Sequence, residues 1–400
     1  MAKLVEIVGK PLSGEWGKDD ETGEGIPVIR TTNFENDGTI NYNNVVTRKI
    51  IKKNIENKYL QEGDIIIEKS GGSDKFPVGR VVYFTGQEKK YLFNNFTGLL
   101  RVQDKQKWYP RYVFYSLFAN YKMGGTRVFE NKTTGLHNLK IDDYISRYEI
   151  GEKSYIYQVT ICERLDKIYE IIKFRKNQLQ LFNDLLQARF VEMFGDPFIN
   201  TKNWKKEKIK DAVIVEPQNG MYKPQSDYVT DGSGTPILRI DGFYNGAVTD
   251  FSSLKRLLCD ESEKKKYLLK ENDIVINRVN SIEYLGKCAH ISGLVEETVY
   301  ESNMMRMHFD SERFDPIYVT HLLCSRFIYD QIVNHAKKAV NQASINQKDV
   351  LDFDIYQPPL ELQNEFADFV RQTDKSKLAI QKELDKTQLL FDSLMQEYFG

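Results

Sequence analysis

The chain has 400 residues, which exceeds one ordinary domain and predicts two or three. Its hydrophobic fraction of 41% and charged fraction of 28% are those of a globular protein with sizeable cores. Lys and Arg together number 56 against 57 Asp and Glu, so no global excess of positive charge points to a nucleic-acid partner.

Membrane insertion and a secretory route are both excluded on this reading. No apolar run approaches the roughly 20 residues that a spanning helix needs, and the first ten residues lack the apolar core of a signal peptide. The four cysteines are scattered without a Cys-x-x-Cys pair, which is typical of reduced thiols. We therefore expect a cytoplasmic protein.

The chain repeats itself. Pro27-Val-Ile-Arg30 is answered by Pro236-Ile-Leu-Arg239, a separation of 209 residues. Further matches follow in the same order: Gly63–Ile67 with Asn272–Ile276, Val78–Arg80 with Leu285–Lys287, Asn95 with Asn303, Tyr112-Val113 with Tyr318-Val319, Asn138 with Asn346, and Phe194-Gly195 with Phe399-Gly400. The separations drift between 205 and 209 residues, as loop insertions and deletions would cause. The sequence therefore predicts two copies of one unit.

The first part of each copy predicts a mixed α/β globule. Ile65–Ile67 and its counterpart Ile274–Ile276 are β-branched triplets after turn-forming residues, which indicates buried strands. Arg80–Phe84 and Leu99–Val102 predict further strands. Tyr109–Tyr121, with Pro110 near its start, predicts a helix.

The last 40 or so residues of each copy predict a long helix. Apolar residues step by four and three from Ile161 to Met193 and again from Phe366 to Tyr398, which is heptad spacing. Gly and Pro are absent between Ser154 and Phe194 and between Leu360 and Phe399. A rise of 1.5 Å per residue makes about 36 such residues roughly 54 Å long.

The predicted fold is therefore α+β: two tandem target-binding domains, each followed by a long helix, with the two helices paired as an antiparallel coiled coil. The expected boundaries are 1–150, 151–196, 197–356 and 357–400. Polar residues at Arg175, Arg189 and Lys377 interrupt the apolar seams. We expect these three residues to help bind a partner protein; a plain core helix bundle is the alternative.

Motifs for catalysis are missing. The sequence contains neither a G-x-x-x-x-G-K loop nor G-x-G-x-x-G. Asp64, Glu68 and Lys69 resemble a nuclease cluster only faintly, because the second copy has Asn277 in place of the second acid. His321 and Cys324 share a helical face, where a satisfied core pair is favoured over a zinc site. No enzyme, bound metal or cofactor is expected.

Polar and basic residues instead recur at matching places where strands pass into loops. Arg and Lys suit guanine edges and phosphates, and Asn and Gln suit adenine edges, although solvated loop polarity is the plainer alternative. The candidates for DNA contact are Arg30, Lys69, Arg80, Arg127 and Lys132 in the first copy, and Arg239, Arg278, Lys287, Lys338 and Gln342 in the second. Phosphate anchoring is the expected role of the repeated basic residues.

With these residues in view, the whole chain resembles the specificity subunit of a type I restriction-modification system. The motifs that carry the resemblance are Gln357-Pro-Pro-Leu-Glu-Leu-Gln363, Phe366–Val370, the terminal Leu394–Gly400, Ile26–Phe34 and Gly135–Leu139. In the first copy the Pro-Pro-Leu segment reads Gly151-Glu-Lys-Ser-Tyr155, yet Gln158 stays in register with Gln363.

The resemblance implies a non-catalytic subunit that reads a bipartite, asymmetric target in double-stranded DNA, with the paired helices fixing the spacing. It implies two DNA adenine methyltransferase subunits and a motor-nuclease restriction subunit as partners, to which S-adenosylmethionine, ATP and magnesium belong. Three alternatives remain: a coiled-coil scaffold with two peptide- or protein-binding heads, a sequence-independent nucleic-acid clamp, and the recognition half of a self-sufficient enzyme. The last is disfavoured because the chain begins and ends at repeat boundaries.

Overall fold

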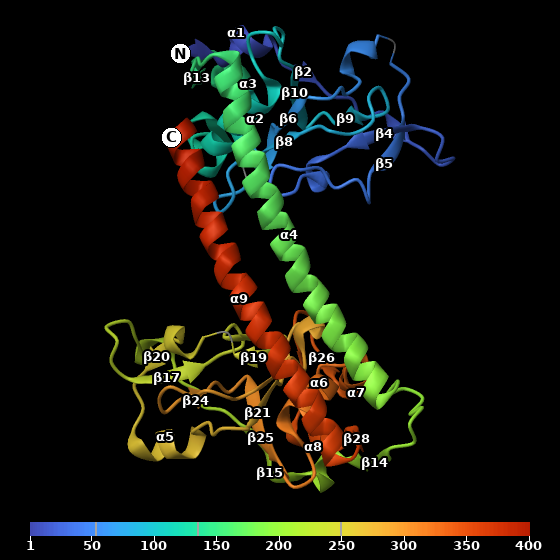
Figure 1. The fold of residues 1–400 in the computed structure, drawn as a ribbon, viewed down its shortest axis with the longest axis vertical. Coiled ribbons are helices and arrows are strands. Elements are labelled where there is room, and N and C mark those ends of the chain that lie inside the picture. Colours follow the sequence, from blue (N-terminus) through green and yellow to red (C-terminus); the bar gives the residue numbers. More distant parts are fainter. Residues whose placement is uncertain (53, 134–135, 249) are drawn as a thin grey trace. The chain divides into compact units, whose positions relative to one another are not determined.

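The chain divides into two compact units. The computed structural model describes residues 1–52, 54–133, 136–248 and 250–400. Unit 1 comprises residues 1–177 and 381–400, and unit 2 comprises residues 178–380 (Figure 1). Helix α4 (Tyr155–Phe194) and helix α9 (Leu360–Phe399) each contribute one part to either unit. Each helix has 40 residues, so both predicted long helices are confirmed.

Unit 1 combines four small sheets with short helices. A four-stranded sheet has the order β2-β10-β6-β8, a second has β3-β5-β4-β9, a third has β11-β12-β7, and β1 pairs with β13. Their bounds are β1 Ala2–Lys3, β2 Leu12–Ser13, β3 Lys18–Asp19, β4 Ile26–Ile29, β5 Val46–Lys49, β6 Ile65–Glu68, β7 Ser70–Gly72, β8 Val81–Tyr83, β9 Leu92–Phe93, β10 Thr97–Leu100, β11 Glu130–Thr133, β12 Leu136–Leu139 and β13 Glu149–Ile150. The helices are α1 Leu4–Val8, α2 Pro110–Lys122 and α3 Ile141–Arg147.

Unit 2 repeats this plan. Its sheets have the orders β15-β25-β21-β23-β19-β18, β16-β20-β17-β24, β22-β27-β26 and β14-β28. The bounds are β14 Lys205–Lys208, β15 Val213–Asn219, β16 Tyr228–Val229, β17 Thr235–Leu238, β18 Phe243–Tyr244, β19 Gly246–Val248, β20 Arg256–Leu257, β21 Ile274–Asn277, β22 Val279–Asn280, β23 Cys288–His290, β24 Val299–Tyr300, β25 Met304–Phe309, β26 Lys337–Lys338, β27 Ala343–Ser344 and β28 Asp354–Gln357. The helices are α5 Glu261–Tyr267, α6 Pro316–Leu323, α7 Arg326–His335 and α8 Gln347–Leu351.

The predicted strands and the first predicted helix are present, with small shifts at their ends. The two β-branched triplets lie in β6 and β21, where all four residues of each strand are buried. The strand predicted at Leu99–Val102 begins two residues earlier, as β10. Helix α2 begins at Pro110, which has no N–H to leave unsatisfied in the first turn.

Corresponding backbone hydrogen bonds define the register of the repeat. Lys69 N–H donates to Phe96 O, and Arg278 N–H donates to Asn303 O. The carbonyl oxygens of Lys69 and Arg278 accept from Leu139 and Ile345, respectively. Phe96 therefore corresponds to Asn303, and Leu139 corresponds to Ile345. The predicted matches of Asn95 with Asn303 and of Asn138 with Asn346 are out of register by one and two residues, because short loops with similar polar composition can be aligned in several ways.

A buried glutamine joins each long helix to its unit. Gln363 Oε1 accepts from Asp315 N–H at 2.9 Å, and its Nε2 donates to the carbonyl oxygens of Arg313 and Pro358 at 3.0 and 2.8 Å. In unit 1, Gln158 makes the corresponding three bonds, with Tyr109 N–H at 2.9 Å and with the carbonyl oxygens of Lys107 and Lys153 at 3.0 and 2.9 Å. The register of these glutamines, read from the sequence, is confirmed.

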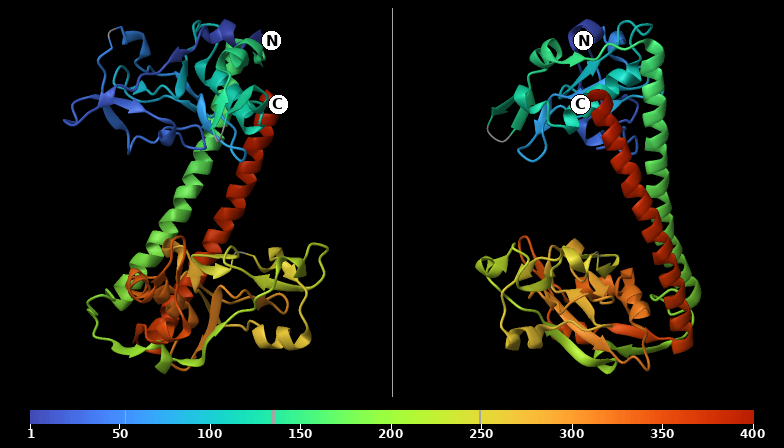
Figure 2. Two further views of the ribbon diagram at one scale, coloured as in Figure 1. Left: turned by 180° about the vertical axis from the view of Figure 1, so that it is seen from behind. Right: turned by 60° about the vertical axis from the view of Figure 1, so that its left-hand side comes forward.

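The two long helices contact each other within each unit and run antiparallel there. In unit 1, Arg164 of α4 donates to Tyr398 of α9, and Arg175 donates to Thr387. Residue numbers increase along α4 as they decrease along α9, so the two helices are antiparallel. The C-terminal end of α9 also lies beside α2, where Tyr112 and Phe399 have ring centroids 5.2 Å apart (Figures 1 and 2).

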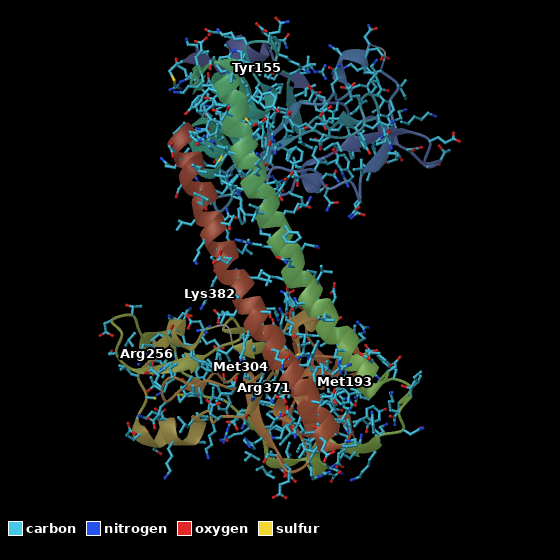
Figure 3. All side chains as sticks on the ribbon, in the orientation of Figure 1. Tyr155, Met193, Arg256, Met304, Arg371 and Lys382 are labelled. Atoms are coloured by element: carbon cyan, nitrogen blue, oxygen red, sulfur yellow. The ribbon has the colours of Figure 1, made fainter. Side chains whose placement is uncertain are left out.

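In unit 2 the same helices enter the main core. Phe190 and Phe194 of α4 pack on Phe366 of α9 and on Tyr318 of α6. This core continues into the central sheet through Met305, Met307 and Phe309 of strand β25. Met304, the first residue of β25, is fully buried in a second hydrophobic cluster of unit 2 (Figure 3). No helix in the described part of the chain is long and apolar enough to cross a membrane.

Candidate nucleic-acid interface

The repeated basic residues gather at two places in each unit. The first is the turn after β4 or β17, where Arg30 and Arg239 begin a loop. The second is the three-stranded sheet, β11-β12-β7 in unit 1 and β22-β27-β26 in unit 2. Lys69 and Arg278 directly precede strands β7 and β22 of these sheets.

Arg80 and Lys287 hold the first of these places together. Arg80 donates from Nη2 to Thr31 O at 2.9 Å and from Nη1 to Phe34 O at 3.1 Å. Lys287 Nζ donates to Ile240 O at 2.8 Å, and Ile240 occupies the position in unit 2 that Thr31 occupies in unit 1. The side chains therefore bind the same loop in both units. This contact makes Arg80 and Lys287 supports of the loop that carries Arg30 and Arg239.

Arg30 and Arg239 each keep donor capacity. The guanidinium of Arg30 lies 5.9 Å from the ring centroid of Trp16, and that of Arg239 lies 5.4 Å from Tyr228. Arg239 also comes within 3.5 Å of Glu301. Within the described residues, neither buried Nε atom has a hydrogen-bond partner. The N–H groups at the ends of these guanidinium groups can donate to a phosphate oxygen, so both side chains stay candidates for phosphate contact.

Burial affects two of the candidate lysines. It lowers the pKa of Lys69, whose Nζ donates to Ser13 Oγ at 3.3 Å, against a smaller opposing effect of Asp142. It also lowers the pKa of Lys287, whose Nζ lies 3.7 Å from the ring centroid of Tyr244. A phosphate brought near either ammonium would restore the charged form, because an opposite charge favours ionisation.

The other candidates lie on the three-stranded sheets or next to them. Lys338 is exposed on β26, and Gln342 lies in the hairpin between β26 and β27, where its carbonyl oxygen accepts from Ala339 N–H at 2.7 Å. Arg278 precedes β22 and donates from Nη1 to Ser302 O.

In unit 1, Arg127 Nη1 donates to Asp74 O at 3.2 Å, which ties it to the loop after β7. Lys132 belongs to β11, but its side chain lies outside the described residues. Whether these ten residues contact DNA remains a prediction.

The faint nuclease-like cluster has a structural explanation. Asp64 is fully buried and accepts from Arg101 Nε and Nη2 at 2.7 and 2.6 Å, and its Oδ2 also accepts from Gln61 N–H. Asp273 repeats the arrangement with Lys270 N–H and Arg306. Its other oxygen lies 2.9 Å from His308 Nδ1. These aspartates therefore close the turn before β6 and β21.

The histidine and cysteine that share one face of α6 point to different neighbours. His321 packs against the rings of Phe190 and Phe366. Burial lowers its pKa to about 4. Cys324 Sγ lies instead 3.2 Å from Cys288 Sγ, and both are free thiols. Among the residues that the structure describes, no group of three or more His, Cys, Asp or Glu is arranged to hold a metal ion.

The polar residues of the helix seams are engaged within each unit. Arg175 Nη1 donates to Glu383 O and Thr387 Oγ1 of α9. Arg189 Nη2 donates to Glu365 Oε1 at 3.0 Å, and Lys377 Nζ lies 3.3 Å from Asp374 of its own helix. Two of the three residues thus join α4 to α9. Their predicted role toward a partner protein stays a prediction.

Sequence reasoning missed one repeated feature, a pair of exposed aromatic residues. Phe76 lies in the loop between β7 and β8, and Tyr284 lies in the corresponding loop between β22 and β23, one residue away from the position that aligns with Phe76. Their exposed fractions are 60% and 61%. The sequence repeat did not reveal them, because the two loops differ in length and the residues are one position out of register with each other.

The chain contains two copies of one α/β unit, and basic residues recur at the loops of both copies. Each copy is attached to the long antiparallel helices. This arrangement is typical of a protein that binds a ligand with two separate parts. Residues 201–388 match the family model described as "Type I restriction modification DNA specificity domain". The chain is 24% identical over 395 residues to the specificity subunit of the type I restriction enzyme EcoKI from Escherichia coli (strain K12), covering 93% of this chain and 80% of that one. It is 29% identical over 200 residues to the putative MjaX specificity subunit of Methanocaldococcus jannaschii, covering 50% of this chain and 46% of that one.

Solved structures agree in fold. The S subunit of a type I restriction-modification system from M. genitalium is similar with a TM-score of 0.57 at 14% identity, covering 100% of this chain and 95% of that one. A chain from a structure of a type I restriction-modification assembly is similar with a TM-score of 0.54 at 13% identity, covering 100% and 96%. Residues 201–388 thus match the specificity-domain family, and nearly the whole chain is similar in sequence, at low identity, to a type I restriction enzyme specificity subunit. The solved structures show the same fold.

Proposed function

We propose that this chain is the non-catalytic subunit that reads a bipartite, asymmetric target in double-stranded DNA. Each unit reads one half of the target, and helices α4 and α9 fix the interval between the halves. The chain directs two adenine methyltransferase subunits and a motor-nuclease restriction subunit to that target. Methyl transfer and cleavage belong to those partners.

The observation that supports this proposal best is the repetition of one framework with different exposed residues. The glutamine contacts, the loop supports Arg80 and Lys287, and the order of the sheets recur in both units. The three-stranded sheets differ: β26 of unit 2 carries the exposed Lys337 and Lys338, whereas the corresponding strand β11 of unit 1 begins with Glu130 and the exposed Asn131. The two units therefore share a framework but differ in their exposed residues. This combination suits recognition of two different DNA sequences, because positioning contacts carry no sequence information whereas base contacts do.

Selection from a random pool of duplex DNA tests the proposal. The chain is purified with the methyltransferase encoded beside it, and the pool is bound at one stated salt concentration, since phosphate contacts make affinity depend steeply on salt. Two short enriched blocks at a constant interval are the expected result. No enrichment would refute the proposal and would favour the scaffold with two peptide-binding heads.

An exchange of surface residues assigns the blocks to the units. A variant with altered exposed residues in the β26–β27 hairpin of unit 2 is expected to change one block and leave the other block and the interval unchanged. A change in both blocks would contradict separate reading by the two units. The unaltered unit 1 serves as the control within the same molecule.

A further inference from the structure

Phe76 and Tyr284 present large rings to solvent from corresponding loops of the two units, with exposed fractions of 60% and 61%. One exposed aromatic residue alone needs no explanation, because apolar atoms are common on protein surfaces. The coincidence is informative because the two loops share little else: they read Ser73–Pro77 in unit 1 and Ser281–Tyr284 in unit 2.

Hydrogen bonds hold the backbone of each loop at the residue that carries the exposed ring. In unit 1, Ser73 N–H donates to Phe76 O at 2.7 Å, and Phe76 N–H donates to Ser73 Oγ at 3.2 Å. In unit 2, Tyr284 N–H donates to Ser281 O at 3.1 Å, and Tyr284 O accepts from Asn277 Nδ2 at 3.1 Å. Among the described residues, neither ring packs on another aromatic ring. An unburied ring on a hydrogen-bonded loop can contribute apolar contact without ordering of the loop backbone, which lowers the entropic cost of binding.

Each ring lies beside the three-stranded sheet that carries the candidate basic residues. In unit 1, Lys75 Nζ lies 5.3 Å from the Phe76 ring centroid, and Arg127 donates to the neighbouring Asp74. In unit 2, the loop of Tyr284 follows β22, which pairs with the β26–β27 hairpin carrying Lys338.

The end of that hairpin adds a second exposed apolar side chain, because Val340 is 99% exposed. The carboxylates of Asp74 and Glu283 adjoin the two loops, so each surface mixes charges of both signs, with cations nearest the first ring. The ring of Phe76 has a flanking cation, and the sheet that adjoins the loop of Tyr284 carries the exposed Lys338. An apolar ring near basic residues fits a DNA groove, where base edges and the thymine methyl group accept apolar contact and phosphates line the rim.

We propose that Phe76 and Tyr284 are the apolar groove contacts of the two units, each packing on bases of the half-site that its own unit reads. This inference rests on the proposed function and adds the residues that make contact. The rings supply sequence-dependent contact without charge, whereas Lys338 and the other exposed basic residues supply contact to phosphates.

The test uses the complex with the methyltransferase and the selected duplex. Phe76→Ala and Tyr284→Ala are each expected to weaken binding of the intact target by roughly tenfold, within the range of one good base contact. Because no phosphate contact is lost, the slope of log affinity against log salt is expected to stay the same. Val295→Ala is the matched control, since Val295 is 67% exposed on a loop next to Glu296 and Glu297.

Scrambled half-sites sharpen the test. On DNA in which only the half-site of unit 2 is scrambled, Tyr284→Ala is expected to cost nothing further, whereas Phe76→Ala keeps its roughly tenfold effect. Wild-type affinity in both variants, or the same loss on every duplex, would overturn the inference while leaving the proposed function standing. If the unaltered complex selects no DNA sequence, both the proposed function and this inference fail.

Discussion

The buried glutamine of each unit gives a prediction whose size follows from the structure. Gln363→Leu removes one acceptor and two donors from a fully buried site. A typical internal hydrogen bond contributes roughly 0.5–1.5 kcal/mol net, so three of them amount to about 3 kcal/mol. The leucine fills a similar volume, and the loss therefore reflects the unsatisfied Asp315 N–H and the carbonyl oxygens of Arg313 and Pro358.

Hydrogen exchange resolved by peptide measures this loss in each unit separately. A single unfolding free energy is not well defined for a chain with two units. Gln363→Leu is expected to lower the opening free energy of unit 2 by about 3 kcal/mol and to leave unit 1 as the control. Gln158→Leu is expected to do the reverse. A loss below about 1 kcal/mol in the altered unit, which is less than one typical hydrogen bond, would refute the reasoning.

A second substitution separates the donors from the acceptor. Gln363→Glu keeps an oxygen that accepts from Asp315 N–H. The second carboxylate oxygen replaces Nε2 and faces the carbonyl oxygens of Arg313 and Pro358, which repel it. Burial and these carbonyl oxygens are expected to raise the pKa of the introduced carboxyl above its unfolded value. A group with a raised pKa in the folded state loses stability as the pH rises through that pKa, so this variant is expected to recover as the pH falls.

Three further predictions concern other sites. His321 has a folded pKa of about 4 because it is buried between aromatic rings. As the pH falls, His321 is therefore protonated in the unfolded state before it is protonated in the folded state. The unfolding free energy of unit 2 is expected to fall by at most about 3 kcal/mol between pH 6.5 and pH 4. His321→Gln should flatten that dependence in pH-resolved exchange, and an unchanged profile would contradict it. Lys338→Ala is expected to reduce the slope of log affinity for DNA against log salt concentration by about 1. A lower affinity with an unchanged slope would argue against phosphate contact. A small disulfide oxidant is expected to join Cys288 to Cys324, with two thiols lost and the oxidant reduced to its thiols, and thiol titration of Cys324→Ser should show no such pair.

The roles of the repeated basic residues could be assigned only from the structure. Arg80 and Lys287 were predicted as DNA contacts because they are basic residues at matching places where strands and loops meet. Their donors are used on the carbonyl oxygens of Thr31, Phe34 and Ile240. If they touch DNA as well, they do so while holding the loops that present Arg30 and Arg239.

The sequence by itself determined the duplication, the buried strands β6 and β21, and the bounds of the two long helices. These features are local: a β-branched triplet after a turn forms a buried strand, and a stretch without Gly or Pro at heptad spacing continues as a helix. The spacing of the two glutamines was also readable, because both lie at a fixed distance from the ends of breaker-free segments.

Only the tertiary structure decided which side chains are satisfied internally and which stay available. Arg80 finds its carbonyl partners 46 and 49 residues away, and the thiols of Cys288 and Cys324 meet across 36 residues. Phe76 and Tyr284 are exposed because the loops that carry them close on their own backbone. Spacing along the chain says nothing about such contacts, because a polar side chain in a loop bonds to whichever donor or acceptor the fold brings within about 3 Å.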